Sequence, residues 1–310
     1  MINDFKSKES VKMPLLVKSV LNGVTQKGAK YLSLVFQDKS GSIDGKFWDV
    51  SEAQASIIKA GHVYEVIGEV LEYNKSLQLR VNHLNEIDES KIDLNDFVMV
   101  SNVPQDVLHN KIDQALASLQ NPNYHLLVKT IYEEIGSAFY QYPAAAKIHH
   151  SFLGGLATHV TGMIDVADAL CKLYPSINRD LLVSGIMMHD IGKMVELSGP
   201  IMTEYTLEGK LLGHISIMQA KIMEVAKRLQ LEKSEEAILL RHMVLSHHGH
   251  YEYGSPVLPM VKEAEILYLI DNLDARINTL DSALEQIKPG EFTSKLFALE
   301  NRQFYKPKHQ

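Results

Sequence analysis

The chain has 310 residues, of which 45% are apolar and 22% charged, as in an ordinary soluble globular protein with room for two domains. Its single cysteine, Cys171, excludes an intramolecular disulfide and a four-cysteine zinc site. The formal net charge of −7 argues against a nucleic-acid partner for the chain as a whole. Residues 1–85, however, carry 11 Lys and Arg against 9 Asp and Glu, and this small positive charge is compatible with binding a polyanion.

No apolar run in the chain approaches the roughly 18 residues of a membrane span. The first apolar run, Met13–Val17, is short and contains a proline, so it does not have the pattern of a secretory signal. We therefore expect a cytoplasmic protein without a membrane partner.

The first quarter of the chain has the alternation of short β-strands. Residues 1–12 are polar and are expected to form a loose arm. Five strands are expected, with a helix before the fourth: a first strand from Leu15, then Tyr31–Phe36, Ile43–Trp48, the helix Ser51–Lys59, His62–Leu71 and Leu77–Val81. This count is typical of an OB-fold, a small all-β barrel that often binds nucleic-acid strands. We predict such a domain over residues 1–88.

Aromatic and basic side chains on these strands are candidates for contact with a nucleic acid. Stacking on an aromatic side chain contributes about 1–3 kcal/mol per base. The predicted contacts are Phe36, Lys46, Phe47, Trp48, Tyr73 and Arg80, with Lys30, Tyr31 and Lys75 as further candidates. Each aromatic ring has about even odds of facing the barrel core instead. Because Phe47 and Trp48 are neighbours in a strand, they point to opposite faces, and at least one should reach the surface.

The rest of the chain changes to helical periodicity. Residues 89–104 are rich in polar and turn residues and are predicted to be a linker. The expected helices are Val107–Leu119, Tyr124–Phe139, Leu156–Leu173, Arg179–Met188, His214–Leu229, Ser234–Ser246 and Val261–Leu284. The sequence therefore predicts a multidomain protein, in which an all-β barrel is followed by an all-α domain over residues 105–310. The pattern after Pro289 predicts no defined element.

Histidines and acids recur through the helical part in an order that could build a metal site. The pair His189-Asp190 offers a neutral nitrogen and an anionic oxygen, a mixture that suits Zn, Mn, Fe or Co. The other members are His159, His214, the doublet His247-His248 and Asp271. A single histidine is more often a surface residue or a hydrogen-bonded core residue. Several of them on apolar helical segments are better explained by a bound cation.

The order of these residues resembles that of the HD-domain superfamily of metal-dependent phosphohydrolases. The resemblance implies that His159, the His189-Asp190 pair and Asp271 are ligands. Asp274 is a rival for the last position, but in the family the ligand directly follows the apolar run, which favours Asp271. Asp274 is then expected to support a ligand or to neighbour Arg276.

The resemblance also implies two divalent ions with Asp190 as their bridge, because extra histidines match those of the two-metal members. One ion would bind His159, His189, Asp190 and Asp271, and the other would bind Asp190, His214, His247 and His248. Adjacent His247 and His248 can reach one ion only at a helix end, which Gly249 could provide. Gly155 stands where some three-metal cyclic-dinucleotide hydrolases carry a carboxylate, which counts against that branch.

Two such cations activate water and offset the charge on a phosphodiester, so no Ser or Cys nucleophile is required. The catalytic candidates are Asp190 and Lys193, and Lys193 would hold a non-bridging phosphate oxygen. Weaker candidates for phosphate contact are His149, His150, Arg241 and Arg276.

Over its whole length the chain resembles the YhaM-type 3′–5′ exoribonucleases, which have an OB-fold followed by an HD domain. The segments that carry this match are His149–Leu156, His189–Lys193 and Leu245–Gly249. The resemblance implies hydrolysis of single-stranded RNA from its 3′ end. Single-stranded DNA is a further candidate substrate, because attack of a metal-bound hydroxide on a phosphodiester needs no 2′-hydroxyl. It also implies two divalent ions, with Mn²⁺ expected and Fe, Co or Zn as alternatives.

Two other functions stay open at this point. One is an HD phosphohydrolase that acts on mononucleotides or cyclic dinucleotides, for which the barrel would be unnecessary. The other is a non-catalytic nucleic-acid-binding protein with a silent metal site. Whether the chain forms a homo-oligomer is also left open.

Overall fold

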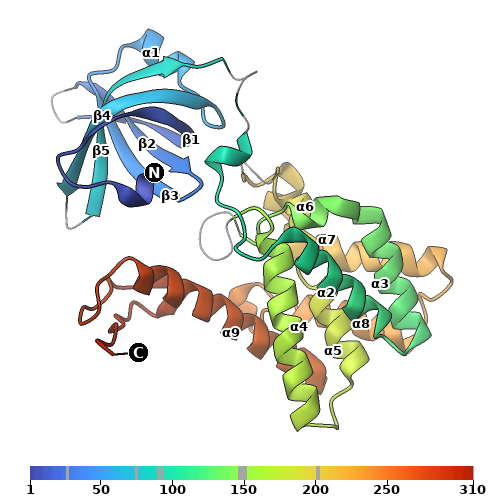
Figure 1. Cartoon of the computed structure of the whole chain (residues 1–310). Coiled ribbons are helices and arrows are strands. Elements are labelled where there is room, and N and C mark those ends of the chain that lie inside the picture. The colour runs from blue at the N-terminus through green and yellow to red at the C-terminus, as the bar shows by residue number, and fades with distance from the viewer. Residues whose placement is uncertain are drawn as a thin grey trace. The chain divides into compact units, whose positions relative to one another are not determined.

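The structure is a computed structural model that describes residues 1–25, 28–73, 76–88, 92, 94–145, 152–199 and 203–309. The chain divides into two compact units, Met1–Val100 and Ser101–Gln310, which are labelled by element in Figure 1. Each unit has its own hydrophobic core. The division lies inside the segment 89–104, for which a linker is predicted.

The first unit is a closed five-stranded barrel with the strand order β1-β2-β3-β5-β4. Its elements are β1 (Ser10–Val24), β2 (Lys30–Asp38), β3 (Gly41–Trp48), the short helix α1 (Glu52–Ile57), β4 (Val63–Tyr73) and β5 (Ser76–Glu86), followed by the 3₁₀ helix η3 (Leu94–Phe97). All pairs are antiparallel except β3 with β5. In β3 the side chains alternate regularly between the core and the surface, which places Ile43 and Phe47 inside. The predicted barrel with its helix before the fourth strand is confirmed.

The prediction of a loose arm over residues 1–12 is wrong. A 3₁₀ helix η1 (Ile2–Asp4) opens the chain, and β1 begins at Ser10. Ile2 and Phe5 are buried in the barrel core, and the Asp38 carboxylate accepts a hydrogen bond of 2.8 Å from the backbone N–H of Ile2. Two apolar side chains in a polar segment are enough to anchor it, because each buries its apolar area against the barrel.

The second unit is all-α, as predicted. Its helices are α2 (Gln105–Ala117), α3 (Pro122–Ile135), α4 (Gly155–Leu173), α5 (Arg179–Met188), α6 (Lys193–Glu196), α7 (Leu207–Arg228), α8 (Glu235–Ser246) and α9 (Lys262–Glu285), with the 3₁₀ helix η4 (Gly136–Tyr140) after α3. Asn178, Thr206 and Ser234 cap the N-termini of α5, α7 and α8 with their side chains. Among the described residues, no helix is long and apolar enough to cross a membrane.

Helix α5 lies at the centre of this unit. Every residue from Leu181 to Met188 is buried, and α5 packs against α3, α4, α8 and α9. Because α5 is apolar and buried on all sides, the residues that follow its C-terminal end also lie in the interior. Here those residues are the pair His189-Asp190.

Helix α7 begins seven residues earlier than the predicted start at His214. The expected start corresponds to a kink, because Gly213 has a φ of 71° inside the helix. A left-handed residue of this kind favours glycine. His214 therefore begins a new helical segment, and the kink sets the direction of its side chain.

The chain after α9 folds into a small hairpin (residues 292–305). Two antiparallel bridges, Phe292 with Tyr305 and Leu296 with Arg302, close it, and a 3₁₀ helix η6 (Phe297–Leu299) forms its tip. Lys306 Nζ donates to the carbonyl oxygens of Leu284 and Ile287 at 2.7 and 3.0 Å. A cation at this place neutralises the partial negative charge of the helix C-terminus.

Candidate functional site

The predicted ligands converge from five helices of the second unit. His159 lies on α4, His189 ends α5, His214 follows the kink of α7, the doublet His247-His248 ends α8, and Asp271 lies on α9. His159, His189, Asp190 and His247 are almost completely buried. The doublet sits at a helix end because Gly249 has a φ of 76° and its N–H bonds to the carbonyl of Ser246.

Glycines allow α6 and α7 to come close enough to complete the site. A Cβ on Gly192 would lie 2.2 Å from the carbonyl oxygen of His214, and one on Gly209 would lie 2.2 Å from the carbonyl oxygen of Glu196. Neither position can therefore carry a side chain without moving the backbone. The close approach brings the Glu196 carboxylate to His214.

Each of the five histidines is oriented through its Nδ1 atom. The partners are the carbonyl oxygens of Ile186 for His189 at 2.8 Å, of Val244 for His247 at 2.7 Å and of Tyr253 for His248 at 2.7 Å. His159 bonds to Asp274 Oδ2 at 2.6 Å and His214 to Glu196 Oε1 at 3.1 Å. A hydrogen bond at Nδ1 fixes the ring and leaves Nε2 as the nitrogen that faces the centre.

The Nε2 atoms form two groups on either side of Asp190. Asp190 Oδ2 lies 3.3 Å from His189 Nε2 and 3.8 Å from His159 Nε2. Asp190 Oδ1 lies 3.5 Å from His214 Nε2 and 3.7 Å from His247 Nε2. The candidate ligand atoms of His159, His189 and Asp271, and likewise those of His214, His247 and His248, lie within 4.8 Å of one another. One carboxylate thus presents a different oxygen to each group.

Asp271 and Asp274 contact opposite nitrogens of the same imidazole. Asp271 Oδ1 lies 3.3 Å from His159 Nε2, on the side of the centre. Asp274 binds Nδ1, on the far side, and Gly162 leaves room for it because an added Cβ would lie 3.3 Å from Asp274 Oδ1. Asp271 can therefore contact a cation in the centre, whereas Asp274 orients the imidazole of His159.

The residues present fit divalent cations. Asp190 Oδ1, His214 Nε2 and His247 Nε2 are buried and have no hydrogen-bond partner within the part of the chain that the structure describes. Leaving buried polar atoms unpaired costs about 1–3 kcal/mol each. Imidazole nitrogens combined with carboxylate oxygens are a donor set that suits Mn, Fe, Co or Zn.

The electrostatics of the centre are dominated by Asp190 and its neighbours. Burial disfavours the carboxylate, but Lys193, His189 and His214 outweigh this effect and hold the pKa of Asp190 well below its usual range. The Lys193 ammonium donates to Asp190 Oδ2 at 2.6 Å. Burial also opposes the imidazolium of His159, yet hydrogen bonds to Asp271 and Asp274 raise the pKa of His159 to about 10. Binding of a cation at His159 would therefore release a proton.

Glu196 is a site residue that sequence reasoning missed. Its carboxylate accepts from both the backbone N–H and Nδ1 of His214, each at 3.1 Å, and His214 lowers the pKa of the Glu196 carboxyl against the effect of burial. The one feature of the sequence that could have indicated Glu196 is its place three residues after Lys193, on the same helical face. This spacing alone does not identify a site residue.

Replacing Glu196 with alanine should lower the Mn²⁺ affinity of the His214 group by about 10–100-fold, because His214 loses the acceptor that orients it. The measurement is the midpoint of Mn²⁺ binding to the purified chain in a calorimetric titration. Glu196→Gln, which keeps an acceptor, should lose less. Glu204→Ala removes an exposed side chain nearby in sequence and serves as the control. An unchanged Mn²⁺ midpoint in Glu196→Ala would refute the role.

Two of the six predicted nucleic-acid contacts are wrong. Phe36 and Phe47 are buried in the barrel core, with exposed fractions of 0% and 6%. They cannot stack on a base, because their alternation in the strand points them inward. Trp48 and Tyr73 are exposed, at 45% and 65%, in line with the expectation that one of Phe47 and Trp48 reaches the surface.

Three of the four remaining contacts, Lys46, Trp48 and Arg80, share the outer face of β2, β3 and β5 with Tyr31. The rings of Tyr31 and Trp48 pack with centroids 4.8 Å apart, and Lys46 Nζ lies 5.1 Å from the Tyr31 ring centroid. Arg80 is the register neighbour of Lys46 and pairs with Glu69 at 2.5 Å. Tyr73 lies apart from these residues at the end of β4.

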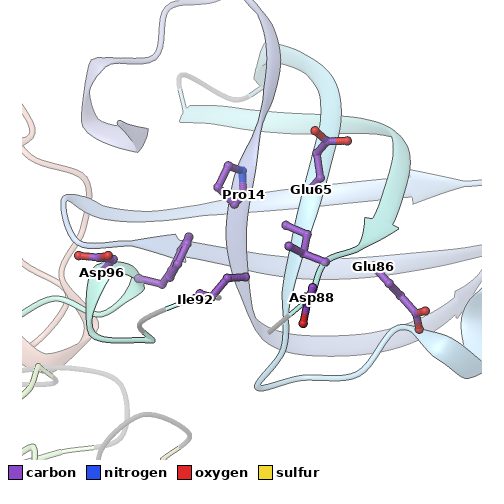
Figure 2. Close-up of a pocket in the computed structure, with 8 residues that line it drawn as sticks. Pro14, Glu65, Glu86, Asp88, Ile92 and Asp96 are labelled. Atoms are coloured by element: carbon purple, nitrogen blue, oxygen red, sulfur yellow. The ribbon is translucent and has the colours of Figure 1, made fainter. Parts of the chain in front are cut away.

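An acidic groove marks another surface of the barrel unit. It encloses about 520 Å³ and is lined by Pro14, Glu65, Glu86, Ile87, Asp88, Ile92, Asp96 and Phe97. Figure 2 shows the four carboxylates around this groove. Their charge repels phosphate, so a nucleic-acid strand should avoid it.

Three weaker candidates cannot be placed, because Lys75, His149 and His150 lie outside the described residues. Arg241 is held by Gln219, whose side-chain oxygen accepts from Nε and Nη2 at 3.0 and 2.9 Å. Its guanidinium is therefore engaged within the helical unit.

Comparison with known proteins agrees with both units. Residues 156–276 match the HD domain family, and residues 16–87 match the family described as OB-fold nucleic acid binding domain. The chain is 46% identical over 300 residues to the 3′–5′ exoribonuclease YhaM of Geobacillus sp. (strain WCH70), which covers 96% of this chain and 92% of that protein.

Among solved structures, the chain resembles the second OB-fold domain of replication protein A from Methanococcus maripaludis. That match has 23% identity and a TM-score of 0.24, and it covers 28% of this chain and 93% of the domain. A replication protein A heterotrimer bound to single-stranded DNA matches with 16% identity and a TM-score of 0.26, covering 36% of this chain and 29% of that one.

Proposed function

Because this chain belongs to the family of the 3′–5′ exoribonuclease YhaM, we propose that it shortens single-stranded RNA from the 3′ end by metal-dependent hydrolysis. The observation that carries the proposal is the position of Asp190, whose two oxygens face two separate groups of Nε2 atoms. A carboxylate between two ligand groups is the arrangement by which proteins hold a pair of cations over one phosphodiester.

In this proposal the two groups are the ligand sets of two ions. The first set is His159, His189, Asp190 and Asp271, and the second is Asp190, His214, His247 and His248. Mn²⁺ is the proposed ion, with Fe, Co or Zn as alternatives that the same donors accept. The Irving–Williams order makes the cellular supply of each metal, rather than affinity alone, decide among them.

When bound, the cations supply an activated water and offset the charge that develops on the phosphate oxygens. The protein's own part is to orient the ligands and to place positive charge. Lys193 is mostly buried beside Asp190, so its ammonium is positioned to bind a non-bridging phosphate oxygen of the substrate. Burial strengthens such a contact, because water competes less for the ammonium.

The barrel supplies the grip on the strand. Tyr31 and Trp48 offer stacking surfaces, and Lys46 and Arg80 lie beside them for phosphates. Stacking is tolerant of sequence, and neither stacking nor phosphate contact requires a 2′-hydroxyl. Single-stranded RNA in the cytoplasm is the proposed substrate, with single-stranded DNA as a further one.

The test of this function is a pair of end-labelled oligoribonucleotides incubated with Mn²⁺. A 3′-labelled strand should release its label early as a mononucleotide, whereas a 5′-labelled strand should shorten progressively. A chelator should stop both reactions, and a duplexed 3′ end should slow them, because the strand must enter the centre end first. Internal cuts among the first products would show an endonuclease and overturn the proposal.

A further inference from the structure

The helical unit is acidic over most of its sequence and basic at its C-terminal end. Residues 101–285 carry 14 Lys and Arg against 22 Asp and Glu, whereas residues 286–310 carry 5 against 2. The segment after α9, which contains the C-terminal hairpin, is thus a basic element on an otherwise acidic unit. Basic segments of this kind favour contact with polyanions.

The tip of this hairpin contacts α9 through an arginine cluster. Arg276 Nη1 and Nη2 donate to the two carboxylate oxygens of Glu300 at 2.9 and 3.1 Å. Arg302 Nη2 lies 2.6 Å from Glu300 Oε2. Two guanidinium groups converge on one carboxylate, so the cluster keeps a net positive charge. Figure 1 shows the chain turning back at the end of α9.

The geometry of this cluster is that of an anion site. A carboxylate bound end-on by the two terminal nitrogens of an arginine presents two oxygens as a phosphate does, and the same guanidinium can bind either group. Glu300 is 61% exposed, and its φ is 54°, a left-handed value that is costly for a residue other than glycine. Because the Glu300 carboxylate is exposed, a phosphate from solution can reach the two guanidinium groups and replace it.

Aromatic side chains extend from the metal centre to α9, the helix that carries Arg276. The ligand candidate His248 bonds to the carbonyl of Tyr253, and the His250 ring lies 5.3 Å from the Tyr253 ring and 5.4 Å from the Tyr268 ring, between centroids. Tyr268 packs directly on Gly249, where a Cβ would lie 2.4 Å from its ring.

Tyr268 and Arg276 lie on one face of α9, eight residues apart, and a long helical side chain reaches back towards the N-terminus. Arg276 also follows Asp274 by two residues in α9, and the Asp274 carboxylate lies 2.6 Å from Nδ1 of the ligand candidate His159. The arginine therefore stands close to the ligand set along the helix. Tyr253 is exposed at 61% and offers a ring face to a base.

We propose that Arg276 and Arg302 form a phosphate subsite for the RNA strand next to the metal centre, and that the Glu300 carboxylate occupies the place of this phosphate in the structure. The inference rests on the proposed function and adds to it where the helical unit holds the strand. In this arrangement Glu300 competes with the substrate, and the two partners of one ion pair have opposite effects on RNA binding.

The test compares Arg276→Ala with Glu300→Gln in the full chain. Arg276→Ala should raise the KM for a single-stranded oligoribonucleotide about tenfold, because a bidentate phosphate contact is lost. It should also reduce the slope of log KM against log salt by about 0.7, as expected for one phosphate contact on a single strand. Glu300→Gln should lower the KM about threefold, because the competing charge is removed. Arg276→Lys should fall between Arg276→Ala and the parent chain.

The chain offers a matched control in Glu134, which also lies between two cations, Lys221 and Arg228. Glu134→Gln and Arg228→Ala should leave the KM for RNA unchanged. Hydrolysis of bis(p-nitrophenyl) phosphate, which has no second phosphate to bind, should be unchanged in the Arg276 and Glu300 variants.

A structural role for the ion pair predicts a different result. If Glu300 only clamps the hairpin to α9, Glu300→Gln and Arg276→Ala should both lower the melting temperature and both raise the KM, which would overturn the subsite. An unchanged KM in Arg276→Ala would also overturn it. Failure of the proposed function is recognised separately, since the parent chain with Mn²⁺ would then not shorten the strand from its 3′ end.

Discussion

Asp190→Ala is expected to reduce hydrolysis by a factor on the order of 10³ or more while RNA binding by the barrel persists. Among the residues that the structure describes, Asp190 is the one carboxylate that faces both histidine groups, through Oδ2 on one side and Oδ1 on the other. Its loss removes a ligand from both groups and also the partner of the Lys193 ammonium. Activity should be measured on a 5′-labelled oligoribonucleotide with Mn²⁺, and binding by fluorescence anisotropy of the same strand.

The alanine variant also leaves a buried ammonium unpaired, which can cost about 3–5 kcal/mol of stability. Asp190→Asn keeps the shape of the side chain, so it separates loss of charge from loss of packing. This variant should be as inactive as Asp190→Ala but more stable to unfolding. Asp281→Ala, which truncates an exposed carboxylate on α9, is the control. Turnover at the parent rate in a folded Asp190→Asn chain would end the two-metal proposal.

Deleting residues 1–100 is expected to raise the KM for a long single strand about tenfold or more and to leave dinucleotide hydrolysis nearly unchanged. The helical unit carries 19 Lys and Arg against 24 Asp and Glu, so on its own it should hold a polyanion poorly. A barrel bound upstream keeps the 3′ end at a high effective concentration near the centre. The measurement is kcat and KM across a series of strand lengths.

The helical unit has its own core and is a compact unit, and circular dichroism of the truncated chain should show its helices intact. Trp48→Ala in the full chain should give a weaker loss with the same dependence on length. Salt should inhibit the intact chain on long RNA more steeply than the truncated one. An equal loss on every length, with the helices intact, would rule out the barrel as a substrate clamp.

The parts of this molecule that depend on local patterns were predictable. The long helices have apolar periodicity and breaks at proline and glycine, and their predicted ranges differ from the observed ones mainly at the ends. The histidines stand on or beside buried helices, and the resemblance of their order to the HD-domain superfamily predicted which side chains meet near Asp190. The alternation in β3 predicted that Phe47 and Trp48 face opposite ways.

Features that depend on packing between distant elements could not be predicted. Alternation assigns Phe36 and Phe47 to a face but does not say which face a closed barrel encloses, and the structure places both inside. Glu196 reaches His214 only because Gly192 and Gly209 let two helices touch. The hairpin after α9 is held by Lys306 on the helix carbonyls and by Glu300 on Arg276, contacts to which sequence spacing gives no guide.

The hydrogen bonds at Nδ1 of the five histidines determine at which step these side chains lose their conformational entropy. Each ring is bonded to a carbonyl or carboxylate of its own unit, so its rotational freedom disappears as the chain folds and not when an ion arrives. A rigid cage of this kind selects ions by radius and charge, because it cannot reshape itself around a poorly fitting one. The binding free energy of a well-fitting ion then adds to the stability of the helical unit as a whole.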